Sequence, residues 1–224
     1  MIAGALTLAW GAVVWRWQDP FTALYTLYEQ HELSHAYKKR ISQFRVPHVP
    51  DAVLGRTRVS IQAEQRVIRA EAHSYRLDSH EGQPLGRIIV PRLGLNMIFI
   101  DGTDESSLER GPGRDLQTSM PGEHRLVYIA GHRTTYLAPF SHIDSLRKGD
   151  PITLQLPYAT FVYAVTRHII VPADDLTVLQ PGHQELLALQ GCHPRFFATQ
   201  RYIVYARPIR VIPNIQRGRP YSPR

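Results

Sequence analysis

The sequence predicts a mainly β protein, folded as a closed or partly closed barrel or a sandwich with a few short helices. Seven or eight short runs of β-branched and apolar residues follow Leu85, separated by Gly, Pro and Asp turns. The stretch before Leu85 is helical in character. The 224 residues, 43% of them hydrophobic and 20% charged, suffice for one globular domain with additional segments. A single cysteine excludes an intrachain disulfide framework and a Cys-rich zinc module.

The N-terminal stretch MIAGALTLAWGAVVW carries no charge before Arg16. Its length of about 15 residues is short of the roughly 20 that cross a bilayer, and Trp10, Trp15 and Trp17 are typical of a membrane interface. A membrane helix, a signal-peptide core and a buried helix are the three alternatives. Because a basic n-region and an Ala-x-Ala-like site are both missing, we favour a short or truncated membrane anchor over residues 1–17.

Residues 18–80 predict a helical stalk or appendage. The segment after Pro20, FTALYTLYEQHELSHAYKKRISQF, places apolar residues at helical spacing. Pro47 and Pro50 end this helix, and a second one, rich in Ala, Glu, Gln and Arg, runs from about 56 to 79. The alternative is that both helices pack on the main domain.

Residues 81–212 predict the β-domain, and 213–224 a basic tail. The runs at 88–90 and 95–101 read as two strands, and 104–110 as a short helix capped by Asp104. LVYIAGH (126–132) predicts a buried strand, and APFSHIDSL (138–146) a short helix or turn. The remaining strands are expected at 151–156, 160–171, 185–192 and 201–212.

The basic excess lies wholly at the C-terminal end of the chain. The formal net charge is +7, and seven arginines follow Glu185, the last acidic residue. Lysine is scarce, and no cluster of basic and aromatic residues marks one element, which argues against nucleic-acid binding. An anionic envelope or membrane surface is the partner that this charge fits.

Cys192 follows an apolar run at the predicted end of a strand, where a side chain can reach a cleft. The alternatives are a buried inert thiol and a nucleophile, which needs a proton-handling partner and an oxyanion donor. His132 ends the strongest buried-strand pattern, after Gly131. If Arg201 begins the next strand, a hairpin places it beside Cys192; Arg195 in the connecting loop and Arg207 farther along that strand are the competing arginines. His193 is a poor partner because adjacent strand residues point to opposite faces.

Metal ligation is not expected. Five residues have suitable side chains but no HExxH-like spacing: His124, His132, His142, Cys192 and His193. The carboxylates Asp101, Asp104 and Glu105 do not form the cluster that a calcium site requires. No cofactor is predicted.

Three blocks resemble the sortases, cysteine transpeptidases on the outer face of Gram-positive cells: AGHRTTYLAPFSHIDSLRKGD (130–150), ALQGCHPRF (188–196) and QRYIVYAR (200–207). The AGHRTTYLAPF segment is most similar to class E. The resemblance covers about 85–212 and implies an eight-stranded barrel behind a single-pass membrane anchor, with an extracellular catalytic domain. It implies that His132, Cys192 and Arg201 are catalytic and that Tyr136 favours Leu-Ala-x-Thr-Gly over Leu-Pro-x-Thr-Gly signals.

One departure from the family pattern affects the nucleophile segment. The family's Thr-Leu-x-Thr-Cys is replaced by Ala188-Leu189-Gln190-Gly191-Cys192, which lacks both threonines. We expect substrate contacts from Leu189 and Gly191 in addition to Tyr136. The absent hydroxyls affect substrate preference and rate more than the class of reaction.

The resemblance implies cleavage of a sorting signal between Thr and Gly in a secreted protein, followed by acyl transfer to an amine of peptidoglycan precursor or of a pilin. One alternative is a catalytically weak or inactive membrane-tethered β-domain that binds envelope proteins. An L,D-transpeptidase also pairs Cys with His, but His193-Pro194 stand where that class has an apolar residue and Arg.

Overall fold

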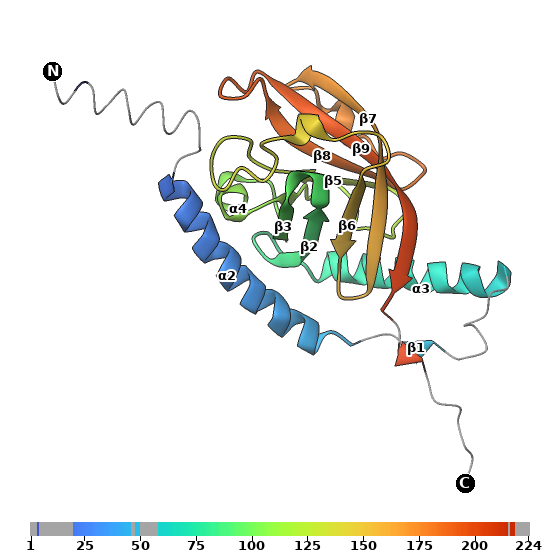
Figure 1. Cartoon of the computed structure of the whole chain (residues 1–224). Coiled ribbons are helices and arrows are strands. Elements are labelled where there is room, and N and C mark those ends of the chain that lie inside the picture. Colours follow the sequence, from blue (N-terminus) through green and yellow to red (C-terminus); the bar gives the residue numbers. More distant parts are fainter. Residues whose placement is uncertain (1–3, 5–19, 46–47, 50–57, 215, 218–224) are drawn as a thin grey trace, which may run out of the picture.

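The computed structural model describes residues 4, 20–45, 48–49, 58–214 and 216–217. Nearly all of the predicted anchor over residues 1–17 and most of the tail 213–224 lie outside these residues. Among the helices that are described, none has both the length and the apolarity to cross a bilayer. The chain forms a closed β-barrel flanked by two long helices (Figure 1).

The barrel has eight strands, which confirms the predicted fold class. Around it run β2 (Pro84–Val90), β3 (Leu95–Asp101), β4 (Gly113–Arg114), β5 (Leu126–Ala130), β8 (Leu186–His193), β9 (Gln200–Pro213), β7 (Ala159–Pro172) and β6 (Pro151–Gln155), which pairs with β2. The parallel pair β5–β8 places segments far apart in the sequence side by side. β1 (His48–Val49) and β10 (Gln216–Arg217) form a separate two-stranded parallel sheet.

The short helices lie in the connections. They are η2 (Pro91–Leu93), α4 (Glu105–Arg110), η3 (Ile143–Ser145) and η4 (Leu176–Leu179). The predicted cap of α4 is present, because the Asp104 side chain accepts a hydrogen bond from the Ser107 N–H. The two-residue strand β4 was not predicted, since Gly113-Arg114 and the Gly-Pro before it carry no alternation of apolar and polar residues.

Strand alternation separates the barrel interior from its outer face. On β8, Leu187 and Leu189 are fully buried in the interior core, whereas Ala188 belongs to a second apolar cluster on the outer face. Tyr128 of β5 and Tyr205 of β9 lie in the same outer cluster. Side chains at even positions of β5 and β8 therefore face outward, toward the segment that carries η4.

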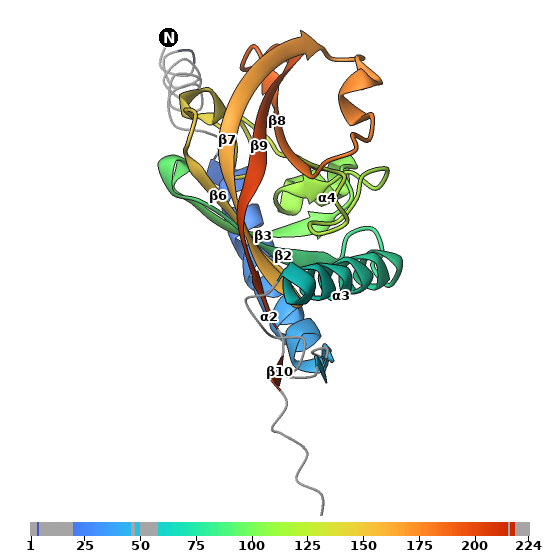
Figure 2. The same cartoon turned by 90° about the vertical axis from the view of Figure 1, so that its right-hand side faces the viewer.

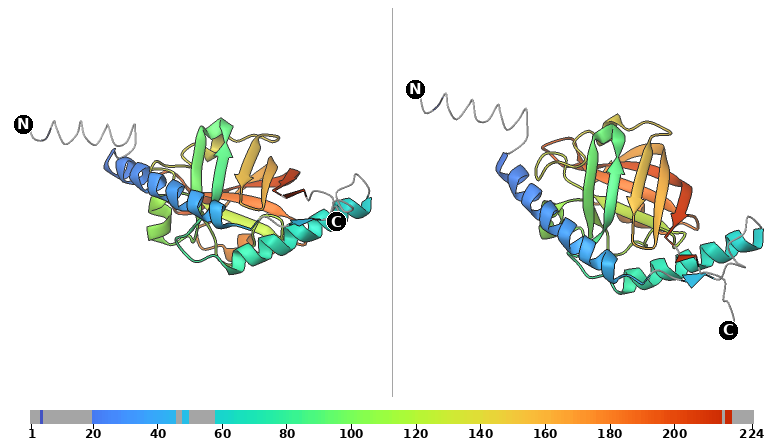
Figure 3. Two further views of the ribbon diagram at one scale, coloured as in Figure 1. Left: turned by 90° about the horizontal axis from the view of Figure 1, so that it is seen from below. Right: turned by 60° about the horizontal axis from the view of Figure 1, so that its bottom comes forward.

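α2 (Pro20–Gln43) lies along the barrel on β2 and β3 (Figures 1 and 3). The residues on its inner face recur every three or four positions and are Thr26, Gln30, Leu33 and Tyr37. The Gln30 amide donates to the carbonyl oxygens of Ile98 (2.9 Å) and Arg110 (2.8 Å), and it accepts from the Ile98 N–H (2.7 Å). These bonds satisfy the N–H and carbonyl groups of Ile98 in β3 and the carbonyl group of Arg110 at the end of α4.

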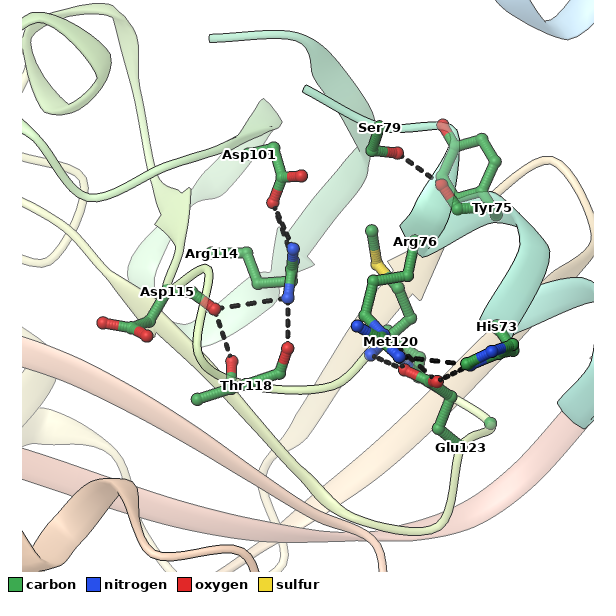
Figure 4. A network of polar contacts seen from close by, with 12 residues as sticks. His73, Tyr75, Arg76, Ser79, Asp101, Arg114, Asp115, Thr118, Met120 and Glu123 are labelled. Carbon is green, nitrogen blue, oxygen red and sulfur yellow. Dashed lines mark hydrogen bonds and ion pairs between the residues drawn. The ribbon is translucent and has the colours of Figure 1, made fainter. Parts of the chain in front are cut away.

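α3 (Arg58–Leu77) closes the lower side of the barrel (Figure 1). Ile68, Ala72 and Tyr75 are buried in the main core. Buried Glu123 accepts hydrogen bonds from His73 Nδ1 (3.0 Å) and from Arg76 Nε (2.9 Å), as Figure 4 shows. Both N-terminal helices thus pack directly on the barrel.

A buried ion pair holds the narrow seam between β3 and β4. Asp101 and Arg114 are partners in the two-residue parallel ladder, and Arg114 Nη2 lies 2.6 Å from Asp101 Oδ1. The Nη1 atom of Arg114 donates to the carbonyl oxygens of Asp115 and Thr118 (Figure 4). This network fixes the chain that leads from β4 toward the cleft.

Candidate active site

Cys192 lies near the end of β8, directly opposite Arg201 in the antiparallel ladder with β9. Directly opposed residues of an antiparallel pair place their side chains on the same face, with Cβ atoms about 5 Å apart. The hairpin predicted from the nine-residue spacing is therefore present. Cys192 is partly exposed, so a solvent-borne reagent can approach its thiol.

His132 reaches the same place from β5. Parallel pairing brings Ala130 beside Gln190, and the Gly131 N–H donates to the Gln190 carbonyl oxygen at 3.0 Å. Gly131 is required here because a Cβ atom would lie 2.7 Å from the Phe140 ring. His132 follows at an even position and emerges on the outer face beside the end of β8.

His132, Cys192 and Arg201 line one cavity of about 260 Å³ on the outer face of the barrel. Tyr128 and Gln190 line it too, and the opposite wall is the β7–β8 connection with η4. Figure 2 shows this connection arching over the outer side of β8 and β9. Three segments distant in the sequence thus surround a single cavity.

The electrostatic setting of His132 combines burial with acidic neighbours. Burial lowers the pKa of His132 below its ordinary value, and the carboxylates Glu109 and Glu105 oppose this effect. The Nε2 atom of His132 is buried and has no hydrogen-bond partner among the described residues. His132 lines the cavity, which makes it the candidate proton-transfer group there.

Tyr136 lies beside His132, with the two ring centroids 5.2 Å apart. It starts a left-handed stretch, since Tyr136, Leu137 and Ala138 have φ angles of 53°, 59° and 39°. The Tyr136 hydroxyl donates to Glu109 Oε1 at 2.6 Å, and this hydrogen bond raises the pKa of Tyr136 to about 12. The Tyr136 N–H donates to Thr22 Oγ1 of α2 at 3.2 Å, so α2 supports the His132 segment.

Arg201 is held by its own loop. Its Nη1 donates to the carbonyl oxygens of Ala198 (2.8 Å) and Gln200 (3.1 Å). Beside it, burial raises the pKa of the Tyr128 phenol, although the charge of Arg201 opposes this. The cavity therefore contains a fixed cation and a phenol that stays neutral at physiological pH.

Two predicted substrate contacts lie on the other side of β8. Leu189 is fully buried in the barrel core, so its side chain cannot touch a peptide in the cavity. A Cβ atom on Gly191 would point at Arg133 and Ile143, away from Cys192. The reason is strand alternation, because both residues are odd-numbered and the cavity side of β8 is even-numbered.

The sequence analysis missed several residues around the site. Tyr128 and Gln190 share the parity of His132 and Cys192 along their strands, which is the signal that could have identified them. Arg133 is buried and donates to the Cys192 carbonyl oxygen at 3.2 Å. No sequence pattern indicates that an arginine is buried at this position. His193 lies outside the cavity wall, with Arg133 Nη1 3.4 Å from its Nδ1.

Among the residues that the structure describes, no three His, Cys, Asp or Glu side chains are grouped to hold a metal ion. The site is a lone thiol flanked by an imidazole and a guanidinium at a strand end of a closed β-barrel. This arrangement is that of a candidate cysteine nucleophile with a proton-handling partner and a cationic neighbour.

Comparison with known proteins identifies the family. The sortase domain profile matches residues 88–209. The chain is 32% identical over 132 residues to Sortase D of Bacillus subtilis, which covers 57% of this chain and 65% of that protein. It is 28% identical over 155 residues to Sortase SrtE1 of Streptomyces coelicolor, which covers 62% of this chain and 44% of that protein.

The fold agrees with this match. The crystal structure of Sortase E1 from Streptomyces coelicolor with a tripeptide in the active site superposes with a TM-score of 0.55 and 27% identity, covering 59% of this chain and 91% of that chain. The chain thus belongs to the sortase family, whose members are cysteine transpeptidases. It spans less than two thirds of the length of the two curated relatives above.

Proposed function

We propose that this protein is a sortase-type transpeptidase that cleaves a Leu-Ala/Pro-x-Thr-Gly sorting signal between Thr and Gly. The acyl chain is then transferred to an amine of peptidoglycan precursor or of a pilin. The observation that carries the proposal is the shared cavity of His132, Cys192 and Arg201. Sortases act on secreted proteins with such signals, and the family membership of residues 88–209 supports this reaction.

In the first half-reaction the Cys192 thiolate attacks the carbonyl carbon of the Thr–Gly bond, and a C–S bond forms. Arg201 faces the developing oxyanion from the neighbouring strand. His132 gives its proton to the leaving amine as the C–N bond breaks, which produces a thioester. In the second half-reaction an incoming amine loses its proton to His132 and attacks the thioester, so that a new amide forms and the thiolate is regenerated.

Mass spectrometry of the intact protein tests the reaction. Incubation with a Leu-Ala-x-Thr-Gly peptide is expected to add the mass of the acyl fragment to Cys192. Addition of an amine acceptor is expected to release a ligated product rather than the free acid. C192A serves as the matched control and forms no adduct. A wild-type protein that stays unmodified under all conditions contradicts the proposal and favours an inactive β-domain that binds envelope proteins.

The preference for Leu-Ala over Leu-Pro signals, which the class E resemblance implies, rests on Tyr136. Its ring lies against His132, and its hydroxyl is anchored to Glu109. A peptide seated beside Cys192 would meet this ring next to the imidazole. The chain matches relatives named Sortase D and Sortase SrtE1. Membership of class E is therefore part of this proposal and not of the family assignment. Paired kcat/KM values for the two peptides measure the preference directly.

We also propose that the protein is held at the cell membrane with its barrel outside. The charge-free sequence of residues 1–15 supports this placement. Leu24 and Tyr28 add to it, because both are exposed on α2 and lie opposite the face that carries Thr26 and Gln30. An apolar stripe of this kind suits the interface of a bilayer.

Sedimentation with phosphatidylglycerol–phosphatidylcholine vesicles tests this placement. The full chain is expected in the pellet, and L24S/Y28S is expected to lower the bound fraction. I212S is the matched control, since Ile212 is exposed at the far end of β9. A full chain that stays in the supernatant contradicts membrane attachment. Equal binding of L24S/Y28S and wild type contradicts the contribution of α2.

A further inference from the structure

Arg133 is the most deeply buried charge beside the candidate active site, and no step of the mechanism above uses it. Its side chain is 2% exposed. We propose that Arg133 is a positioning residue that fixes the end of β8 relative to His132, and so aligns the thiol with the imidazole. This inference rests on the proposed function.

The guanidinium of Arg133 is held by groups from two segments, the end of β8 and residues 141–144. Nη1 donates to the Cys192 carbonyl oxygen at 3.2 Å. Nη2 lies 3.0 Å from Asp144 Oδ2 and donates to the Ser141 carbonyl oxygen at 3.4 Å. Arg133 therefore ties the strand that carries the nucleophile to the η3 segment through a single rigid, planar group.

Sequence adjacency connects this clamp to the proton-transfer group. His132 lines the cavity on the outer side of β8. Arg133, the next residue, lies against Gly191 on the opposite side. The two neighbours thus straddle the end of β8, and any displacement of Arg133 pulls on the backbone of His132. One side chain constrains both halves of the catalytic pair.

Gly191 provides the space for this arrangement. A Cβ atom at Gly191 would lie 2.8 Å from Cγ and 2.9 Å from Cδ of Arg133. The contact is with the buried stem of the arginine rather than with its mobile end, so a side chain at 191 must displace Arg133. Gly191 thus leaves room for the stem of Arg133 in this chain, and the two residues fit as a pair.

The contribution of Arg133 is one of alignment more than of charge. Its carboxylate partner Asp144 is half exposed, which offsets the positive charge close to its source. A misplacement of about 1 Å between reacting groups can lower the rate about 10²-fold. Loss of the clamp should therefore lower kcat while the peptide still binds.

The first experiment compares R133M and R133K with the wild type in peptide transfer. R133M is expected to lower kcat about 10²-fold with little change in KM. R133K is expected to recover only part of this loss, because lysine cannot reach Cys192 and Asp144 at once. R207M is the matched control, since Arg207 is exposed on β9. Melting temperature and alkylation of Cys192 by iodoacetamide verify that each variant is folded with an accessible thiol.

A double-mutant cycle of R133A and G191T tests the pairing. Because G191T displaces Arg133, each single variant is expected to lose the clamp, and the double variant to be no slower than the slower single one. If the losses of rate in the two single variants simply add in the double variant, the pairing is contradicted. A folded R133M with the wild-type kcat overturns the proposal.

A readout without turnover separates this inference from the proposed function. If the wild type forms no acyl-enzyme, the proposed function fails, and the clamp is then judged from the NMR titration of His132. Release of Arg133 is expected to raise the pKa of His132 toward its ordinary value, because the ring gains water. An identical titration in wild type and R133M overturns the clamp.

Discussion

Replacement of Asp101 by Asn should destabilise the barrel far more than most single substitutions. Asp101 and Arg114 are 1% and 2% exposed. Burial raises the pKa of Asp101, and the adjacent charge of Arg114 only partly offsets this effect. The pair is therefore a weak source of stability while it is intact. Breaking it leaves a guanidinium in the interior without a counterion.

The magnitude follows from these contacts. Arg114 directs two nitrogens at one oxygen of Asp101, with Nε at 2.8 Å and Nη2 at 2.6 Å. Removal of one partner from such a buried pair costs about 3–5 kcal/mol. At about 2–4 °C per kcal/mol for a protein of this size, D101N should melt about 6–20 °C below the wild type. The β3–β4 ladder spans only two residue pairs, so neighbouring strand bonds cannot compensate.

Urea and thermal unfolding of wild type, D101N, D101L/R114M and D78N test the reasoning. D78N is the control, since Asp78 is exposed, and it should unfold like the wild type. D101L/R114M removes both charges and should be more stable than D101N. A D101N protein within about 0.5 kcal/mol of the wild type, or a double variant less stable than D101N, would refute the account of this ion pair.

Three further predictions concern α3 and the active site. Burial acts to raise the pKa of Glu123, but the hydrogen bonds that it accepts from a backbone N–H and from Arg76 lower it overall. The ionised Glu123 carboxylate therefore stabilises the fold fully at a pH above its ordinary pKa near 4.5, and this stabilisation is lost as pH falls. E123Q should cost about 1.5–3 kcal/mol at neutral pH and less in acid, as measured by urea unfolding; a pH-independent cost would contradict this. The pKa of His132 is lowered by burial, and Glu109 opposes that effect. E109Q should therefore move the alkaline limb of kcat to lower pH, and a shift to higher pH would be inconsistent with protonated His132 as the acid. Y136F removes the hydroxyl that donates to Glu109 at 2.6 Å and should lower kcat/KM for the Leu-Ala peptide about tenfold, whereas an unchanged value would remove Tyr136 from substrate selection.

Strand periodicity in the sequence predicted a barrel or a sandwich, and the resemblance to sortases implied the eight-stranded barrel that the structure has. Residues that alternate along β7, such as Phe161, Tyr163 and Val165, encode an inner face through local pattern alone. The spacing between Cys192 and Arg201 also predicted their pairing, because a hairpin joins neighbouring strands and its register follows from loop length. Local chemistry of this kind can be read from the chain without coordinates.

The sequence singled out His132, and the sortase resemblance implied that it acts with Cys192, but only the tertiary structure shows how the two meet. The parallel pairing of β5 with β8 joins segments about 60 residues apart, and local pattern cannot predict such a pairing. The tertiary structure also decided that Gly191 faces Arg133 while Cys192 faces the cavity. The residue type at position 192 indicated chemistry based on a thiol. The side of the strand on which each residue lies, and what fills the space behind it, depend on contacts between distant segments that the chain makes only when folded.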